Sequence, residues 1–203
     1  MAETAAIYLA HLNPLTNAHK TIISKLQHEG YHVCVFPVRF LDDGREINTK
    51  SFPFTYELRK EMVESIFGSE VAVFPDYAFH APYSKYMPPL LSSRSWGLRN
   101  QIISKVNEKQ YVSYTGDAPE RLMLKIYRLN PLKATRLDIS ASHVKELLYQ
   151  QVLDGAKAEW KSQVPDSVRD VIERNWEIVE RFARAEDSTK RIMGMKFPRE
   201  GYK

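Results

Sequence analysis

The chain has 203 residues, of which 43% are apolar and 27% are charged, so it is long enough for one compact domain with a full core. No apolar run approaches the roughly 20 residues that a membrane span needs, and the N-terminus lacks the pattern of a secretory signal, which predicts a cytoplasmic protein without membrane contact. The single cysteine, Cys34, excludes an internal disulfide, and the formal charge of +4 favours an anionic partner, either a nucleotide or a nucleic acid.

Short apolar runs alternate with helical patterns along the chain, which is typical of repeated βα units and a mostly parallel sheet. We predict five strands, at residues 6–10, 32–38, 70–74, 110–114 and 135–139. The spacing of apolar residues predicts helices at 18–28, 54–67, 93–107, 118–128, 141–153 and 166–183. The predicted fold class is therefore α/β, a Rossmann-like, doubly wound parallel five-stranded sheet with C-terminal helices.

Residues 184–203 are polar, basic and interrupted by glycine and proline, so we predict an α/β domain over residues 1–183 and a basic C-terminal tail. Residues 40–53 and 75–92 form two long connections, which in α/β domains usually build lids or substrate walls. Right-handed crossovers place the carboxyl ends of all parallel strands on one side of the sheet. We expect the active site on that side.

The first strand leads into a tight polar turn. Asn13-Pro14 ends the strand, Thr16 or Asn17 can cap the next helix, and His19 lies in that helix's first turn. Backbone N–H groups at a helix start have no intrahelical partner and lie at the positive end of the helix dipole. The turn is therefore a predicted anion site, to which His19 adds a donor that is charged or neutral near pH 7.

Several other phosphate and metal motifs are excluded. The glycines give neither the GxGxxG spacing of dinucleotide-binding folds nor the GxxxxGK[ST] spacing of P-loops. Residues 28–32 match the HExxH pattern of zinc proteases, but Gly30 stands where the helix should end and His32 opens a strand. The two histidines would point in unrelated directions, so a zinc protease is a distant alternative and we predict no protein metal ligands.

Two motifs together resemble the nucleotidyltransferase superfamily. Its [H/T]xGH motif in the first βα turn is similar to residues 16–19, TNAH, and its ISxT/S-x-x-[R/K] motif at a late helix start is similar to residues 139–145, ISASHVK. Residues 13–19, NPLTNAH, particularly resemble the NPxTNxH turn of nicotinamide-mononucleotide adenylyltransferases, and residues 164–168, VPDSV, resemble the segment that closes those enzymes. Residues 54–59, FTYELR, are similar to a helix start found in several branches.

The resemblance implies an enzyme of NAD biosynthesis that transfers AMP from ATP to a phosphorylated acceptor, with nicotinamide mononucleotide favoured, and releases pyrophosphate. Such an in-line attack needs positioning and charge neutralisation rather than a covalent nucleophile. By resemblance, the catalytic residues would be His19, Thr16 and Lys145. The implied nucleotide-binding residues lie in the turn after the first strand and at the start of the late helix. They are His11, Leu12, Asn13, Ser140 and Ser142. Mg²⁺ is the implied cofactor, which would bridge the phosphates with few protein ligands.

His11 replaces the small hydroxyl residue usual in the superfamily, and it either adds a phosphate donor or points to solvent. On the acceptor side, Arg39 and Lys50 can clamp the acceptor phosphate or remain solvated surface charges. Gly116 and Asp117 follow the fourth strand, where this family contacts the nucleoside or acceptor ribose, although a turn alone also explains the glycine. Trp96 is a candidate for stacking on a base or nicotinamide ring, with core or subunit packing as the alternative.

Two other functions stay open. A cytidylyltransferase acting on a sugar or alcohol phosphate would share the paired motifs, but such enzymes usually lack the VPDxV ending, so ATP is favoured over CTP. A non-catalytic nucleotide-binding or RNA-binding relative agrees with the sequence pI near 9.0 and with the basic tail. The sequence leaves the oligomeric state open, a homo-oligomer included.

Overall fold

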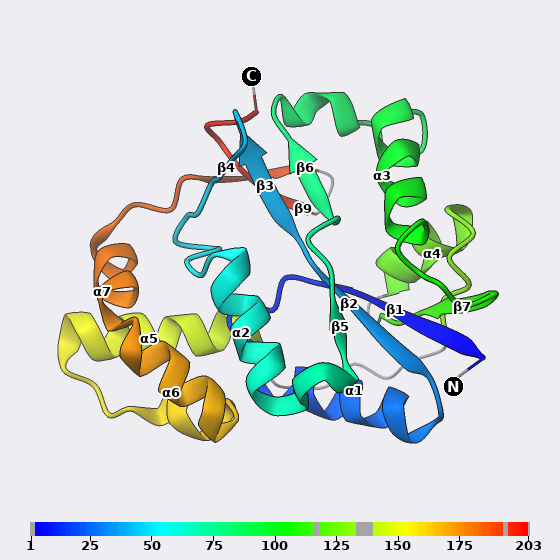
Figure 1. The fold of residues 1–203 in the computed structure, drawn as a ribbon. Coiled ribbons are helices and arrows are strands. Elements are labelled where there is room, and N and C mark those ends of the chain that lie inside the picture. Colours follow the sequence, from blue (N-terminus) through cyan, green and yellow to red (C-terminus); the bar gives the residue numbers. More distant parts are fainter. Residues whose placement is uncertain (1–2, 116–117, 133–139, 193–194, 203) are drawn as a thin grey trace.

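The computed structural model describes residues 3–115, 118–132, 140–192 and 195–202. Within these ranges the main sheet has four parallel strands in the order β5-β2-β1-β7 (Figure 1). They are β1 (Thr4–Ala10), β2 (His32–Pro37), β5 (Ala72–Val73) and β7 (Gln110–Ser113). The α/β class and the first four predicted strands are thereby confirmed. The fifth predicted strand, 135–139, lies outside the described residues.

The helices of the described ranges are α1 (Asn17–His28), α2 (Tyr56–Phe67), α3 (Ser93–Ile103), α4 (Ala118–Ile126), α5 (Ala141–Asp154), α6 (Asp166–Arg174) and α7 (Trp176–Arg184). The predicted helix at 54–67 begins later, because Thr55 caps it and accepts a hydrogen bond from the Leu58 N–H at 3.5 Å. The predicted helix at 166–183 is divided at Asn175 into α6 and α7. No helix in these ranges is long and apolar enough to cross a membrane.

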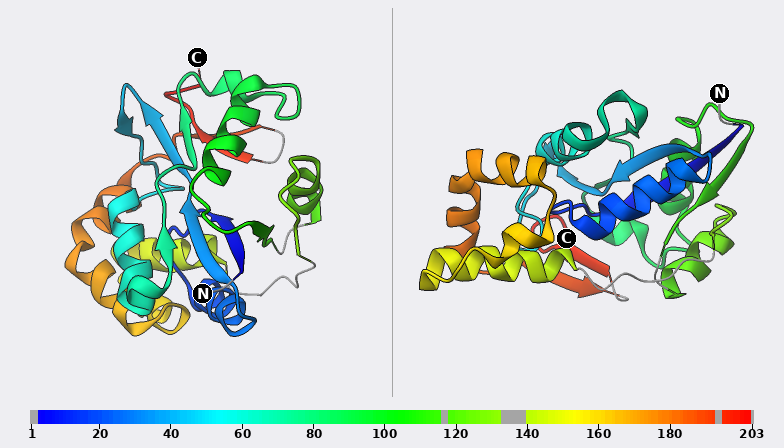
Figure 2. Two further views of the ribbon diagram at one scale, coloured as in Figure 1. Left: turned by 45° about the vertical axis from the view of Figure 1, so that its right-hand side comes forward. Right: turned by 90° about the horizontal axis from the view of Figure 1, so that it is seen from below.

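Strand β1 is apolar along its length because helices cover both faces of the sheet (Figures 1 and 2). Ala6 and Tyr8 point into a cluster formed with α1, α2, α5, α6 and α7. Ile7 and Leu9 point into a second cluster, to which α3, α4 and aromatic residues of the two long connections contribute. Alternate residues of one strand thus reach opposite faces, as the pleat of a strand requires.

The long connection after β2 and the connection after β5 build a second, smaller sheet. Its strands are β4 (Arg45–Glu46), β3 (Arg39–Asp42) and β6 (Ala78–His80), in that order. The rings of Phe40 and Phe79 lie 5.7 Å apart on these strands and belong to the second hydrophobic cluster. The two long connections, expected from the sequence as lids or substrate walls, therefore contribute strands and core residues, and this packing holds their ends in fixed positions.

The end of the chain forms a hairpin of β8 (Thr189–Ile192) and β9 (Met195–Pro198). Phe197 is only 1% exposed, and its ring lies 5.5 Å from that of Phe40 and 5.7 Å from that of Phe79. The carbonyl of Gly201 accepts a hydrogen bond from the Tyr83 N–H at 2.8 Å. The sequence predicts a tail outside the domain, whereas its described residues pack on the second sheet because they supply an aromatic side chain to the core (Figure 1).

Candidate active site

The turn between β1 and α1 fixes the orientation of His19. Thr16 is fully buried and begins α1, and its backbone N–H donates to His19 Nδ1 at 3.0 Å. The Thr16 hydroxyl lies 3.1 Å from the same nitrogen. Because Nδ1 accepts a hydrogen bond from the backbone, the ring proton must reside on Nε2. Burial, followed by the charge of Lys145, lowers the pKa of His19 to about 4, so the ring is a neutral donor at pH 7.

Lys145 joins the late motif to this turn. Its Nζ donates to the carbonyl of Asn13 at 2.8 Å and to that of Ala141 at 3.2 Å. The side chain comes from the second turn of α5, 132 residues along the chain from Asn13. Burial, together with the charge of Lys196, lowers the pKa of Lys145 to about 8. The structure therefore brings together Thr16, His19 and Lys145, the three predicted catalytic residues.

Ser140 and Ser142 lie at the N-terminus of α5. Ser140 caps the helix, and its hydroxyl accepts a hydrogen bond from the Ser142 N–H at 3.2 Å. Both serines are exposed, so their hydroxyl groups can reach a ligand in solution. An uncovered helix N-terminus attracts anions through its free N–H groups and its dipole. The Lys145 bond to Asn13 therefore places this anion-attracting end of α5 against the turn that precedes α1.

Leu12 and Asn13, predicted to bind nucleotide, have buried side chains. Leu12 is fully buried in the core, with a φ of 48°. The Asn13 amide donates to the Phe54 carbonyl at 2.8 Å and accepts from the Phe54 N–H at 3.1 Å. Both side chains thus shape the turn and hold it against the start of α2. Any direct contact of these two residues with a nucleotide would come from the backbone.

His11 is exposed, and its ring stacks on Phe52 with centroids 4.7 Å apart and planes 10° from parallel. Although the residue is exposed, the surrounding protein desolvates the imidazole ring, and the charges of Arg59 and Lys145 add to that effect. Together they lower the pKa of His11 to about 3. The ring is therefore a neutral group beside three cations, with Lys196 as the third.

Arg59 lies beneath the strand ends that carry the site. The sequence does not predict a site role for it. Its guanidinium is 2% exposed and donates to the carbonyls of His11 at 2.9 Å and Val38 at 2.7 Å, at the ends of β1 and β2. It also pairs with Glu46 at 2.7 Å. The residue belongs to the FTYELR segment, which was the available signal. It acts as a positioning residue that fixes the two strand ends.

The C-terminal hairpin places a further cation, Lys196, near the site. The sequence assigns this residue to the predicted C-terminal tail. Lys196 Nζ donates to the Ser51 hydroxyl at 2.9 Å, and that hydroxyl donates to Asp187 at 2.8 Å. The charge of Lys196 contributes to the lowered pKa of both His11 and Lys145. Nothing in the sequence pattern marks Lys196, because its position depends on the packing of the hairpin.

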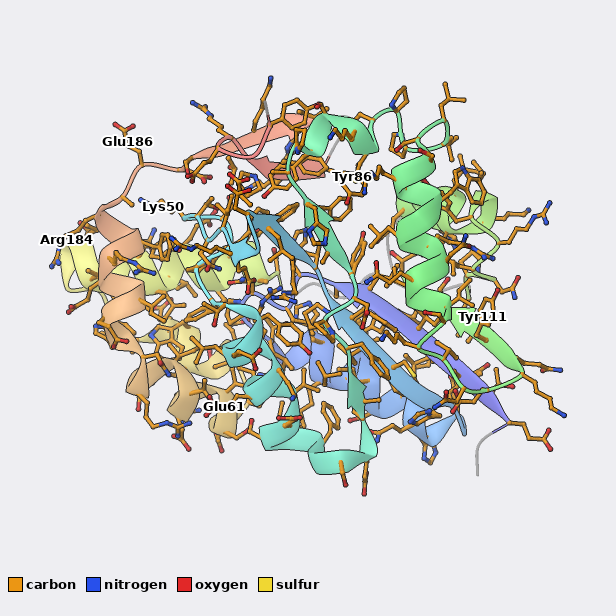
Figure 3. The ribbon with its side chains drawn as sticks, turned by 45° about the horizontal axis from the view of Figure 1, so that its top comes forward. Lys50, Glu61, Tyr86, Tyr111, Arg184 and Glu186 are labelled. Atoms are coloured by element: carbon orange, nitrogen blue, oxygen red, sulfur yellow. The ribbon has the colours of Figure 1, made fainter. Side chains whose placement is uncertain are left out.

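Two predicted acceptor residues have other partners in the structure. Lys50 Nζ donates to the carbonyls of Ala183 at 2.8 Å and Ala185 at 3.1 Å, so it caps the C-terminus of α7 (Figure 3). Trp96 donates to the Leu90 carbonyl at 3.0 Å and packs edge-on against Tyr127. In the structure Lys50 thus caps a helix and Trp96 packs against the residue that follows α4, while the phosphate clamp and the base stacking stay predictions.

Arg39 lies at the site's edge. Its guanidinium sits 4.8 Å from the centre of the Tyr56 ring, and its Nε is 3.9 Å from Glu46. These contacts hold it between the end of β2 and the start of β3 but leave the phosphate-clamping role a prediction. Gly116 and Asp117, the remaining predicted acceptor residues, lie outside the described residues.

A cavity of about 710 Å³ lies on the other face of the sheet, between α3 and α4. Its lining is mostly apolar and includes Leu9, Phe79, Tyr86, Leu98 and Tyr127. Such a lining suits an apolar or aromatic group rather than a phosphate. The polar groups suited to phosphates are therefore those of the β1–α1 turn and α5.

No protein-family model matches the sequence, and no curated protein matches it. Solved structures do match. A bifunctional NMN adenylyltransferase/ADP-ribose pyrophosphatase from Francisella tularensis is 11% identical, with a TM-score of 0.60 over 93% of this chain and 58% of that chain. The Francisella protein in complex with AMP and a manganese ion is 12% identical, with a TM-score of 0.55 over 89% of this chain and 54% of that chain.

Two further structures match over most of this chain. A protein assigned as a nicotinate-nucleotide adenylyltransferase from Vibrio parahaemolyticus is 13% identical, with a TM-score of 0.54 over 88% of this chain and 96% of that chain. The NadR protein, in complex with NAD and AMP-PNP, is 17% identical, with a TM-score of 0.57 over 84% of this chain and 47% of that chain. The chain spans about half the length of the Francisella and NadR proteins.

At these identities the likeness concerns the fold. The chain shares with these structures an α/β fold, which in this chain is built on a four-stranded parallel sheet with helices on both faces. The chain therefore has the Rossmann-like fold of the nucleotidyltransferases that its paired motifs resemble.

Proposed function

We propose that the protein is an adenylyltransferase that transfers AMP from ATP to a phosphorylated acceptor and releases pyrophosphate. The observation that carries the proposal is the 2.8 Å hydrogen bond from Lys145 Nζ to the Asn13 carbonyl. This bond joins the two motifs that resemble nucleotidyltransferases, and it sets Lys145 beside His19. The complexes of the similar structures with AMP, or with NAD and AMP-PNP, support a nucleotide as ligand.

In the proposed reaction an acceptor phosphate oxygen attacks the α-phosphorus of ATP in line. The bond from that phosphorus to the bridging oxygen breaks, and pyrophosphate leaves with the electron pair. His19 donates a hydrogen bond from Nε2 to a phosphate oxygen as charge develops there. Lys145 and the N-terminus of α5 offset the charge of the leaving pyrophosphate. The acceptor phosphate is already ionised, so the step needs no general base.

The carboxylates near this set already have partners. Glu46 pairs with Arg59 at 2.7 Å, and Asp187 accepts from Ser51 at 2.8 Å. The described residues therefore offer a metal few free ligands, which fits a Mg²⁺ ion that arrives on the triphosphate and keeps its waters. When bound, Mg²⁺ would supply charge neutralisation on the phosphates.

Nicotinamide mononucleotide is the favoured acceptor, supported by the NPLTNAH turn and by the adenylyltransferase activities for which the similar structures are named. The test is a screen of ATP, CTP, GTP and UTP against nicotinamide mononucleotide, nicotinate mononucleotide, phosphopantetheine and common phospho-alcohols, with pyrophosphate release as the readout. We expect release with ATP and one of the two pyridine nucleotides. Release with CTP and a phospho-alcohol would identify a cytidylyltransferase instead.

His19→Ala should reduce turnover by about 10²–10³-fold, the usual cost of removing one transition-state donor. The matched control is His28→Ala, which removes an exposed histidine from the end of the same helix. Undiminished pyrophosphate release by the His19 variant would exclude the mechanism. Salt-sensitive RNA binding without turnover by the wild-type protein would favour the non-catalytic alternative.

A further inference from the structure

A second polar cluster lies at the opposite edge of the sheet, where the strands begin. His32 is the first residue of β2, and Cys34 follows two positions later, so both side chains point to the same face of the strand. Glu108 joins them from the loop that precedes β7. The active-site turn follows the carboxyl ends of the strands, and this cluster lies at their amino ends. The two sites are therefore distinct.

The three ligand atoms lie close together. His32 Nδ1 is 2.5 Å from Glu108 Oε1 and 3.9 Å from Cys34 Sγ, and all three ligand atoms lie within 4.8 Å of one another. Cys34 is only 1% exposed. The second carboxylate oxygen of Glu108 is buried and has no hydrogen-bond partner among the described residues. An orphaned buried carboxylate oxygen is costly and calls for a ligand.

We propose that His32, Cys34 and Glu108 bind one divalent transition-metal ion of the zinc class. Imidazole, thiolate and carboxylate are the three ligand types that zinc takes in proteins, and three protein ligands with a water molecule complete its tetrahedral shell. In such a shell neighbouring ligand atoms are about 3.3–3.8 Å apart, by geometry from bonds of ~2.0–2.3 Å. Side-chain movements of about 1 Å therefore convert the present arrangement into a metal site.

Binding replaces the thiol proton of Cys34 with the metal, and that proton passes to solvent as the sulfur coordinates. The hydrogen bond between His32 and Glu108 opens at the same time, so that both ligand atoms can face the ion. The His32 side chain is 40% exposed, which gives the ion a path from solvent and leaves room for a bound water. The bound ion would link the loop before β7 to the start of β2. It would thus stabilise the sheet without touching the active-site turn.

The competing explanation is a His32–Glu108 ion pair against which Cys34 merely packs. The two explanations differ in the role of the sulfur. Cys34 is the only cysteine of the chain, so any cobalt–thiolate absorption must come from this cluster. We therefore choose metal-free protein titrated with Co²⁺, followed in the near-ultraviolet and visible ranges. Competition with Zn²⁺ then measures zinc affinity, and no readout depends on adenylyl transfer.

We expect one equivalent of Co²⁺ to give a thiolate charge-transfer band that Zn²⁺ abolishes. Cys34→Ser should remove the band, and Glu108→Gln should weaken binding by at least about tenfold, because it removes an anionic ligand. His28→Ala is the matched control, since it removes an exposed histidine outside the cluster. Circular dichroism of each variant without metal checks its fold.

Zn²⁺ should also raise the thermal midpoint of the wild-type protein and of the His28 control, but not that of Cys34→Ser, because a ligand of the folded state stabilises it. If Cys34→Ser fails to fold, the Zn²⁺-induced shift of the thermal midpoint is compared between the wild-type protein and Glu108→Gln, in which it should be smaller. Absence of a thiolate band at saturating Co²⁺, or equal affinity in the Glu108 variant, would overturn the proposal and leave the ion pair.

Discussion

His19 carries its proton on Nε2 because Nδ1 accepts the Thr16 N–H, and burial keeps the ring uncharged at neutral pH. The neutral imidazole can still donate a hydrogen bond from Nε2–H to a phosphate oxygen. Lys145 supplies the positive charge that the imidazole lacks. In the proposed mechanism His19 would therefore supply an oriented donor and Lys145 the charge, which a single protonated histidine would have to combine.

Lys145→Arg should extend activity to higher pH. Burial and the charge of Lys196 lower the pKa of Lys145 to about 8, so the ammonium loses its charge as the pH rises through that value. A guanidinium stays charged over the whole range. The alkaline limb of kcat/KM, which reports groups of the free enzyme, should move up by at least about one pH unit.

The control for this shift is Lys20→Arg, an exposed position on α1, which should leave the profile unchanged. Lys145→Met should lower kcat/KM at every pH. An alkaline limb that stays in place in Lys145→Arg would show that another group causes it.

Among the secondary-structure elements, α1 and α5 matter most, because the N-terminus of each begins in one of the paired motifs. Helix α5 packs against α7, and Lys50 holds the end of α7 through the carbonyls of Ala183 and Ala185. Figure 3 shows Lys50 near this end of the helix, where Arg184 and Glu186 are labelled. Lys50 thus supports the candidate site indirectly, because it holds the end of α7, the helix that packs against α5.

Lys50→Met should therefore lower the free energy of unfolding and leave acceptor binding intact. A cation at a helix C-terminus contributes about 0.3–1 kcal/mol, which urea denaturation can measure. The KM for the acceptor should change by less than about twofold, since the ammonium is committed to backbone carbonyls. Lys60→Met, which removes an exposed partner of Glu64, is the matched control. A large rise in the KM for the acceptor, with unchanged stability, would support the phosphate clamp predicted for Lys50 from the sequence.

At the scale of the whole molecule, the protein should lose stability in mild acid. Burial, with the charge of Lys145, lowers the pKa of His19 from 6.5 to about 4 in the folded state. Between these values the unfolded chain binds more protons than the folded chain, so the free energy of unfolding falls as the pH falls from 6.5 to 4. Thermal midpoints across this range test the prediction.

His19→Asn provides the comparison, because asparagine offers an acceptor for the Thr16 N–H and does not titrate. Its thermal midpoint should fall less steeply over the same pH range. Equal slopes for the two proteins would mean that His19 does not cause the acid sensitivity.

The sequence predicts much of the fold because the determining signals are local. Alternating apolar strands and amphipathic helices identify the α/β class, and the Thr16–His19 spacing identifies the helix start and its histidine. Lys145 could be predicted only through its motif. The break at Asn175, the strands of the long connections and the Phe197 anchor depend on tertiary packing, which local patterns do not encode.

The sequence by itself determined the order of the elements, the polar turn before α1 and the residue types of the two motifs, since each depends on residues within a few positions of one another. The tertiary structure decided which charges meet. Only the packing of α5, α7 and the C-terminal hairpin shows that Lys145 reaches Asn13, that Lys196 reaches Ser51 and that Lys50 caps α7. A cation's partners depend on three-dimensional distance, and segments far apart in the chain acquire that distance only when the core forms.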